Sequence, residues 1–268
     1  MIMKKYILTA TLTVSLLLGI NNLNVEAISD SSENTKRDSV EMVLIKADQF
    51  LMGSKSGEGR ADERPQRNIF LDSFSIDVHE VSNARYLKFI QETERKEPPN
   101  SYSDKLLSKE SGVENLPVIQ VTWYDAVDYC RWAGKRLPTE AEWEKAARGK
   151  NGNKYPWGSE LLSKESVNFD KDWEGIKTLW NVDGHDEASS SYGIKNMSGN
   201  VREWVADWYA PDYYQNAPRK NPSGPQTGIL KVIKGGSWHS FKSDIRPASR
   251  GKGGFALKTD GIGFRCVK

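Results

Sequence analysis

Apolar residues recur at helical spacing in three segments, and each segment begins at a hydroxyl residue that can cap a helix, namely Ser82, Thr122 and Thr139. In the third segment Glu142 lies three residues after the cap, so the two side chains can form a capping box, and Gly149 can end the helix. The pattern therefore predicts three short helices. Their predicted buried faces are Tyr86, Phe89 and Ile90 in the first, Ala126, Cys130 and Ala133 in the second, and Trp143, Ala146 and Ala147 in the third.

Short apolar runs at residues 42–45, 69–71 and 230–233 are typical of strands. The stretch 96–114 is polar and contains two adjacent prolines, which favours a surface loop. Periodicity is lost between residues 150 and 195, so we expect that region to be irregular. These predicted helices and strands are few and mixed along the chain, so by themselves they support only an α+β fold class.

The first 27 residues have the organisation of a signal peptide: a basic start, an apolar run over residues 6–20 and a polar segment ending at Ala27. Cleavage after Ala27 would leave a flexible, polar leader over residues 28–40 and a folded domain over residues 41–268. The expected location is secreted or periplasmic. The alternative is retention of an uncleaved segment, which would be the chain's only contact with a membrane.

The composition narrows the class of protein further. The formal net charge is only +2 and the charges are interspersed, so the sequence gives no indication of nucleic-acid binding. Nine Trp and 22 Gly indicate many tight turns packed on large flat side chains. No internal repeat or low-complexity linker divides the chain, and we expect a monomer.

Two cysteines occur, Cys130 and Cys266, and export into an oxidising compartment favours a disulfide between them. Such a bond would close a loop of roughly 135 residues and, in the chain-entropy description, contribute about 5 kcal/mol before any native strain is subtracted. The alternative is two buried free thiols.

Several blocks of sequence, in a fixed order, resemble the formylglycine-generating enzyme and sulfatase-modifying factor family. A single such motif would be weak evidence, but the likeness runs from about Met42 to the last residue. The blocks are FLMGS with DERP at residues 50–54 and 62–65, EVSNARY at 80–86, LPV through GKRLPTEAEWE at 116–144, NMSGNVREW at 196–204, and KGGSW, RPASR and GFRC at 234–238, 246–250 and 263–266.

The resemblance implies a variant of the C-type lectin fold, with a small antiparallel sheet, flanking helices and long ordered loops. It also implies a structural disulfide at Cys130 and Cys266. Catalytic members of the family bind copper(I) through two cysteines that closely follow the Gly-Gly-Ser block, and oxidise a substrate cysteine to formylglycine. Here the residue three past Ser237 is Ser240, and residues 242–245 contain no cysteine. Soft thiolates select copper(I), so copper is not expected in this chain.

Calcium is the metal that the resemblance does support, because oxygen ligands are the set that calcium prefers. One family site matches the oxygens of Asn196, Gly199, Val201 and Glu203. A second site matches in part through Asn168 and the Phe169 carbonyl, with Glu174 and the Ile176 carbonyl as weaker candidates. The alternative for the first set is that Asn196 and Gly199 form a turn and Glu203 pairs with an arginine.

The groove that receives a peptide in catalytic members would be lined here by five candidate residues. They are Ser237, Trp238, His239, Ser240 and Arg250. A nucleophilic Ser237 would need a base, and we expect His239 to be too close in sequence to serve easily. Arg250, like Arg136, could bind an anion, but pairing with a carboxylate such as Glu140 or Glu203 is the simpler expectation.

The sequence therefore favours an exported, non-catalytic or altered-function relative of the family, which uses the groove to bind a peptide, protein or glycan. One alternative is an enzyme that still oxidises sulfatase cysteines through unfamiliar ligands, or that performs another metal-dependent oxidation. Another is a receptor-like domain with a variable binding surface. Whether any catalysis persists is left open by the residues.

Overall fold

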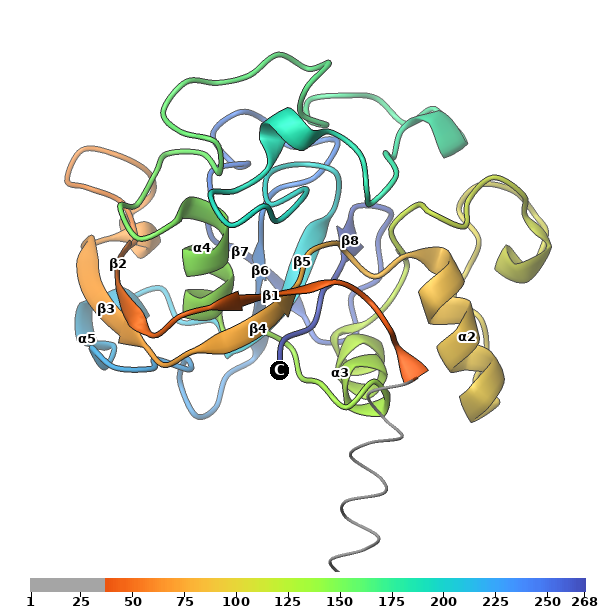
Figure 1. The fold of residues 1–268 in the computed structure, drawn as a ribbon, viewed down its shortest axis with the longest axis horizontal. Coiled ribbons are helices and arrows are strands. Elements are labelled where there is room, and N and C mark those ends of the chain that lie inside the picture. The colour runs from red at the N-terminus through yellow and green to blue at the C-terminus, as the bar shows by residue number, and fades with distance from the viewer. Residues whose placement is uncertain (1–36) are drawn as a thin grey trace, which may run out of the picture.

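The computed structural model describes residues 37–268, in which a central four-stranded sheet is surrounded by helices, two small sheets and long loops (Figure 1). The central sheet has the order β7-β6-β5-β8. Neighbouring strands are antiparallel except for β5 and β8, which run parallel. Its strands are β5 (Arg202–Trp208), β6 (Leu230–Lys234), β7 (Gly251–Gly254) and β8 (Ile262–Gly263).

The other two sheets are antiparallel pairs near the N-terminus of the domain. Strand β1 (Met42–Ile45) pairs with β4 (Phe74–Asp77), and β2 (Asp48–Met52) pairs with β3 (Arg67–Leu71). The strands predicted at residues 42–45, 69–71 and 230–233 are therefore confirmed as β1, as the end of β3 and as most of β6. Strands β2, β4, β5, β7 and β8 were not predicted.

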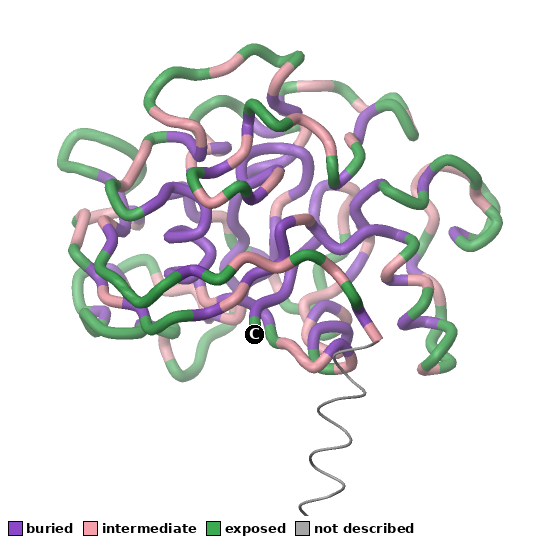
Figure 2. Tube along the Cα trace, in the orientation of Figure 1, coloured by how far each residue is buried: buried purple, intermediate pink, exposed green. Residues whose placement is uncertain are grey.

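The central sheet separates two parts of the hydrophobic core. Successive side chains of a strand point to opposite faces, and β5 and β6 follow this alternation. Val205 and Val232 pack into the cluster that contains Trp143, while Trp204 and Ile233 pack into a second cluster with Tyr129. Buried residues accordingly run through the middle of the molecule, and the exposed ones lie on the peripheral loops (Figure 2).

The three predicted helices are confirmed as α2 (Asn83–Thr93), α3 (Trp123–Trp132) and α4 (Glu140–Arg148). Each begins after the predicted cap, whose side-chain oxygen accepts a backbone N–H, and α3 and α4 both have complete capping boxes. Helix α5 (Tyr213–Asn216) is a single turn. Short 3-10 turns lie at Ala61–Glu63, Leu107–Lys109, Gly175–Lys177 and Asp186–Ala188.

Helix α4 carries two fully buried carboxylates that connect the surrounding segments to one another. Glu140 forms two bonds with the Arg250 guanidinium, at 2.8 and 3.0 Å. Glu144 lies 3.2 Å from the Lys234 ammonium and accepts the Gly53 backbone N–H at 2.7 Å. Buried charges are tolerated when they are paired and hydrogen-bonded, and these pairs attach β6 and two loops to one helix.

The surface loop predicted over residues 96–114 is only partly at the surface. Leu107 and Val113 are buried in a cluster with Leu116 and Val201. These apolar residues are too widely spaced to form a periodic pattern, which is why the sequence did not indicate their burial. The region 150–195 contains no strand or α-helix in the structure, as expected.

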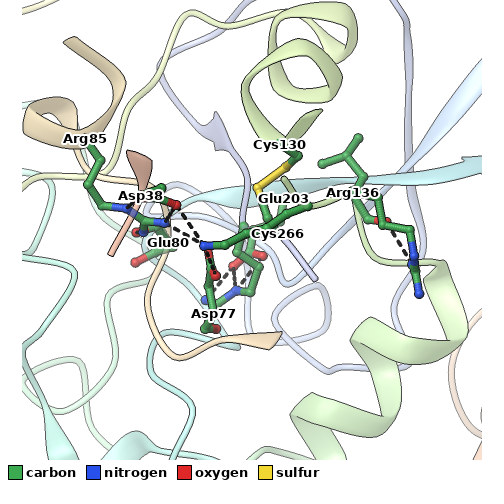
Figure 3. The surroundings of a disulfide bond; sticks show 11 residues. Asp38, Asp77, Glu80, Arg85, Cys130, Arg136, Glu203 and Cys266 are labelled. Carbon is green, nitrogen blue, oxygen red and sulfur yellow. Dashed lines mark hydrogen bonds and ion pairs between the residues drawn. A yellow bond between two sulfur atoms is a disulfide. The ribbon is translucent and has the colours of Figure 1, made fainter. Parts of the chain in front are cut away.

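Residues at the end of the predicted leader already belong to the packed structure. Asp38 is buried, and its carboxylate lies 2.7 Å from the Arg85 guanidinium and 2.8 Å from the Lys135 ammonium (Figure 3). The packed domain therefore includes residues before Glu41. The predicted signal peptide and the leader up to residue 36 lie outside the described residues. Within residues 37–268 no helix is long and apolar enough to cross a membrane.

Cys130 of α3 and Cys266, near the C-terminus, form a disulfide, with their Cα atoms 5.7 Å apart (Figure 3). This confirms the predicted bond and excludes the alternative of two free thiols. Both cysteines are buried in the cluster that includes Tyr86 and Phe264. The bond therefore fixes the C-terminal segment against α3.

We predict that the double variant Cys130→Ala/Cys266→Ala loses up to about 5 kcal/mol of unfolding free energy, because its unfolded chain is no longer restricted by a long closed loop. Urea unfolding of the oxidised protein and of the variant measures the difference. Two titratable thiols in the unreduced, denatured wild-type protein would show that the bond is absent.

Candidate functional site

The Gly-Gly-Ser block forms a tight turn at the end of β6, and this turn positions the candidate residues. Gly235 and Gly236 have φ values of +92° and +69°, in the left-handed region that favours glycine. A Cβ on Gly236 would come within 2.8 Å of the Ile245 side chain. The turn directs residues 237–240 away from the sheet and toward residues 170–173.

The two serines and the histidine of this block lie together. Ser237 Oγ is 3.1 Å from His239 Nδ1 and 3.3 Å from Ser240 Oγ, and the Ser237 backbone N–H donates to Ser240 Oγ. The expectation that His239 is too close in sequence to reach Ser237 is therefore wrong, because the turn brings the two side chains together. Ser237 is nevertheless fully buried, so its hydroxyl cannot be approached by a substrate carbonyl.

Arg202, the first residue of β5, lies against the serine that stands where the resemblance places a copper-binding cysteine. Its Nη2 donates to Ser240 Oγ at 3.0 Å. The pKa of the Arg202 guanidinium is lowered, mainly because burial penalises the charged form; attraction from Asp244 opposes this shift and repulsion from Arg60 adds to it. The site thus contains a cation and hydroxyl groups instead of thiolates.

An open groove of about 550 Å³ runs beside this block. The Trp173 and Trp238 rings meet at its edge, with centroids 5.3 Å apart, and Tyr102 stacks behind Trp173. Trp238 Nε1 donates to the Asp260 carbonyl at 3.1 Å, which fixes the indole orientation. The other lining residues are Asp170, Lys171, Asp172, His239, Phe241, Thr259 and Gly261.

Of the five predicted groove residues, Trp238 and His239 line the groove and Ser237 and Ser240 lie beneath it. Arg250 does not line it, because its buried guanidinium is bound to Glu140. The structure thus confirms the expectation that Arg250 pairs with a carboxylate. Arg136 likewise pairs with Glu142, at 2.6 Å.

The first predicted calcium set does not offer a free carboxylate. Glu203 is fully buried, and its two oxygens accept from Arg265 at 2.7–3.0 Å and from Trp143 Nε1 at 2.8 Å. Asn196 donates its side-chain amide to Glu80 at 2.8 Å. Glu203 thus forms the ion pair with an arginine that we gave as the alternative. A calcium ion at this set would have to replace Arg265 as the partner of Glu203. Calcium at this set stays a prediction.

The second predicted set has an unsatisfied ligand atom. Asn168 Oδ1 is buried and has no hydrogen-bond partner among residues 37–268, whereas its amide nitrogen donates to Asn200 and to the Thr178 carbonyl. Gly199 packs against this position, since a Cβ there would lie 2.3 Å from the Asn168 carbonyl oxygen. Buried polar atoms are normally paired, so this oxygen fits a cation or a water. Glu174 and Ile176, the weaker candidates, are exposed on the loop that follows.

Sequence reasoning missed Arg202, Trp173 and Glu80. Arg202 lies inside the block assigned to calcium, and only the alternation along an unpredicted strand could have shown that it points away from Glu203. Trp173 lies in the region without periodicity. Glu80 was quoted only as part of a motif, yet it is fully buried between the amides of Asn196 and Asn200.

The chain matches the Sulfatase-modifying factor enzyme 1-like domain family over residues 28–268. It belongs to this family. The formylglycine-generating enzyme of Streptomyces coelicolor is 33% identical over 279 residues, which cover 84% of this chain and 88% of that protein. The serine/threonine-protein kinase Pkn1 of Chlamydia caviae is 36% identical over 244 residues, covering 85% of this chain. The match spans only 38% of the length of the chlamydial protein.

Among solved structures, PvdO from Pseudomonas aeruginosa superimposes with a TM-score of 0.73 at 23% identity, covering 87% of this chain and 95% of that one. This likeness confirms the fold as the C-type-lectin-like fold of the sulfatase-modifying factor family. The family explains the order of the sequence blocks. This chain has no free thiol for copper, because both of its cysteines are joined in the disulfide.

We predict that Glu80 makes the domain less stable as pH rises. Burial raises the pKa of Glu80 to about 8 from 4.5, so between these values the folded state holds a proton that the unfolded state has lost. Stability from this group is full below pH 4.5 and is lost as pH rises to 8. Glu80→Gln should reduce the loss between pH 5 and pH 8.5 by about 1–3 kcal/mol in urea unfolding.

Burial also raises the pKa of Asp207 to about 8. The unfolding free energy of the Glu80→Gln variant should therefore still fall with pH, but less steeply than in the wild-type protein. The exposed substitution Glu92→Gln is the control and should keep the wild-type slope. An unchanged slope in Glu80→Gln would contradict the assignment of this pH dependence to Glu80.

Proposed function

We propose that this protein is a non-catalytic member of the sulfatase-modifying factor family that binds a ligand in the groove beside Trp173 and Trp238. One observation carries the proposal. Ser240 stands where a copper-binding cysteine is expected, and its hydroxyl accepts a hydrogen bond from the Arg202 guanidinium. A fixed positive charge beside hydroxyl groups disfavours a copper(I) ion, which needs soft thiolate ligands.

The disulfide supports the same reading. It uses both cysteines of the chain, so no thiolate remains that could bind copper or form a mixed disulfide with a substrate. A stable disulfide is typical of oxidising compartments, which agrees with the predicted export to a secreted or periplasmic location.

The groove has the surface chemistry of a binding site. Its exposed Phe241 and its two tryptophans offer flat apolar area, and the aspartates beside them can accept hydrogen bonds from a ligand. Tryptophan is enriched at binding surfaces because it combines large contact area with a hydrogen-bonding group. A peptide, a protein segment or a glycan could stack on these rings, and we propose one of these as the ligand.

We predict that ligands selected from a peptide-display library or a glycan array lose about tenfold or more in affinity when Trp173 is replaced by Ala, since a stacked aromatic contact contributes on the order of 1–2 kcal/mol. Calorimetry measures the affinities of the purified variants. Trp157→Ala is the matched control, because this tryptophan lies in the same irregular region but outside the groove.

Selected ligands that bind Trp173→Ala and the wild-type protein equally would place binding elsewhere and would remove the groove from the proposal. Circular dichroism and the melting temperature of each variant check that the fold is retained.

We also propose a structural calcium ion at the Asn168 and Phe169 set. The Asn168 Oδ1 atom supports it, because a cation would satisfy an oxygen that no donor within residues 37–268 reaches. The ion would attach the loop that carries Trp173 to the segment around Gly199. It would thus stabilise one wall of the groove.

We predict that calcium raises the melting temperature of chelator-treated protein by a few degrees, because a ligand that binds only the folded state stabilises it. Asn168→Ala should abolish this rise, and the exposed Asn151→Ala should keep it. A rise that survives Asn168→Ala but disappears in Glu203→Ala would assign the ion to the first set instead. If calcium gives the wild-type protein neither a binding heat nor a shift in melting temperature, the proposal of a calcium site is wrong.

A further inference from the structure

A second cavity, of about 380 Å³, is lined in part by Arg202, the residue that donates to Ser240. The two hollows have no lining residue in common. The charged and hydrogen-bonding groups of the cavity come from the Ala61–Glu63 turn, the start of β5, the loop before β7 and β7 itself. They are Arg60, Asp62, Arg202, Tyr209, Asp244 and Lys252.

The charges of this cavity do not balance. Arg60, Arg202 and Lys252 stand against two carboxylates, Asp62 and Asp244, both of which lie closest to Arg60, at 3.7 and 3.1 Å. Asp62 also accepts the Tyr209 hydroxyl at 2.8 Å. Arg250 borders the cavity, but Glu140 neutralises it.

The lining therefore carries one positive charge in excess, and Arg202 and Lys252 are the cations that lie outside these pairs. Within residues 37–268 neither Arg202 nor Lys252 forms an ion pair, although the structure gives Arg202 a hydrogen bond to Ser240 and places Lys252 over the Tyr209 ring at 4.6 Å. Arg202 carries five donor N–H groups, and the bond to Ser240 uses one of them.

A partly buried, unpaired guanidinium is costly unless something compensates its charge. Attraction from Asp244 compensates part of this cost and repulsion from Arg60 adds to it, but the Asp244 carboxylate is itself bound by Arg60. An oxyanion would accept the remaining donors in the fork geometry that guanidinium groups favour, and it would balance Lys252 at the same time.

We propose that this cavity binds a compact oxyanion, a carboxylate, sulfate or phosphate group, between Arg202 and Lys252. The site uses none of the residues that line the groove. It gives the chain a specificity for acidic groups that its overall charge of +2 does not reveal.

The test measures the melting temperature against increasing sodium sulfate, sodium phosphate or sodium acetate at constant ionic strength. We expect at least one of the three anions to give a saturable rise of about 2–5 °C in the wild-type protein. Arg202→Gln should abolish the saturable part. Arg131→Gln makes the same chemical change at an exposed arginine, whose side chain is 77% exposed, and should keep it.

Sulfate and phosphate also stabilise proteins in general by exclusion from the surface, but that effect does not saturate and would be equal in all variants. Equal responses of wild type and Arg202→Gln to all three anions would overturn the proposal. The anion that responds identifies the group, since acetate presents a carboxylate and the other two present tetrahedral oxyanions.

Should Arg202→Gln fail to fold, Lys252→Gln decides the question. Lys252 is exposed at the rim, so its replacement should leave the fold intact and raise the midpoint concentration of the anion severalfold. An unchanged midpoint would overturn the proposal. Loss of groove binding in Trp173→Ala, with the anion response intact, would show that the two sites are separate.

Discussion

The buried carboxylates of α4 are the constraint on which the rest of the structure depends. A domain with this little regular structure must fix long loops by other means, and Glu140 and Glu144 do so with paired charges. Removing Glu140 would leave the buried Arg250 guanidinium without its carboxylate, which is far more costly than losing a surface ion pair. The segment that carries the Gly-Gly-Ser turn follows Lys234 directly, so its position derives from this pairing.

The same scaffold can then carry different chemistry at the turn. In this chain, the residue expected to be a thiolate is a hydroxyl, and a strand residue supplies a guanidinium beside it. The backbone of the turn is set by its glycines, and one wall of the groove by tryptophan packing. Neither feature requires a thiol at the turn, so the proposed binding surface is independent of copper ligands.

The sequence predicted the parts of the structure that are encoded locally. Helices α2, α3 and α4 each have a hydroxyl cap and an apolar face. Two cysteines allow only one disulfide within the chain. The short central strands β5, β7 and β8 were missed because their glycines and buried charged residues obscure the apolar alternation. Glu203 pairs with Arg265, which is distant in sequence, whereas Arg202 has no ion pair within residues 37–268. Only the three-dimensional arrangement therefore shows which arginine is neutralised and which is not.

The most direct test of the central claim is chemical. Purified protein would be incubated with copper(I), oxygen, a reductant and a Cys-X-Pro-X-Arg peptide, and the peptide mass would be followed, with a catalytically active family member as the positive control. The account predicts that the peptide incubated with this protein keeps its thiol over a time in which the control enzyme completes many turnovers. Conversion of the cysteine to an aldehyde would contradict it, because it would require a metal site that neither Ser240 nor the disulfide can provide.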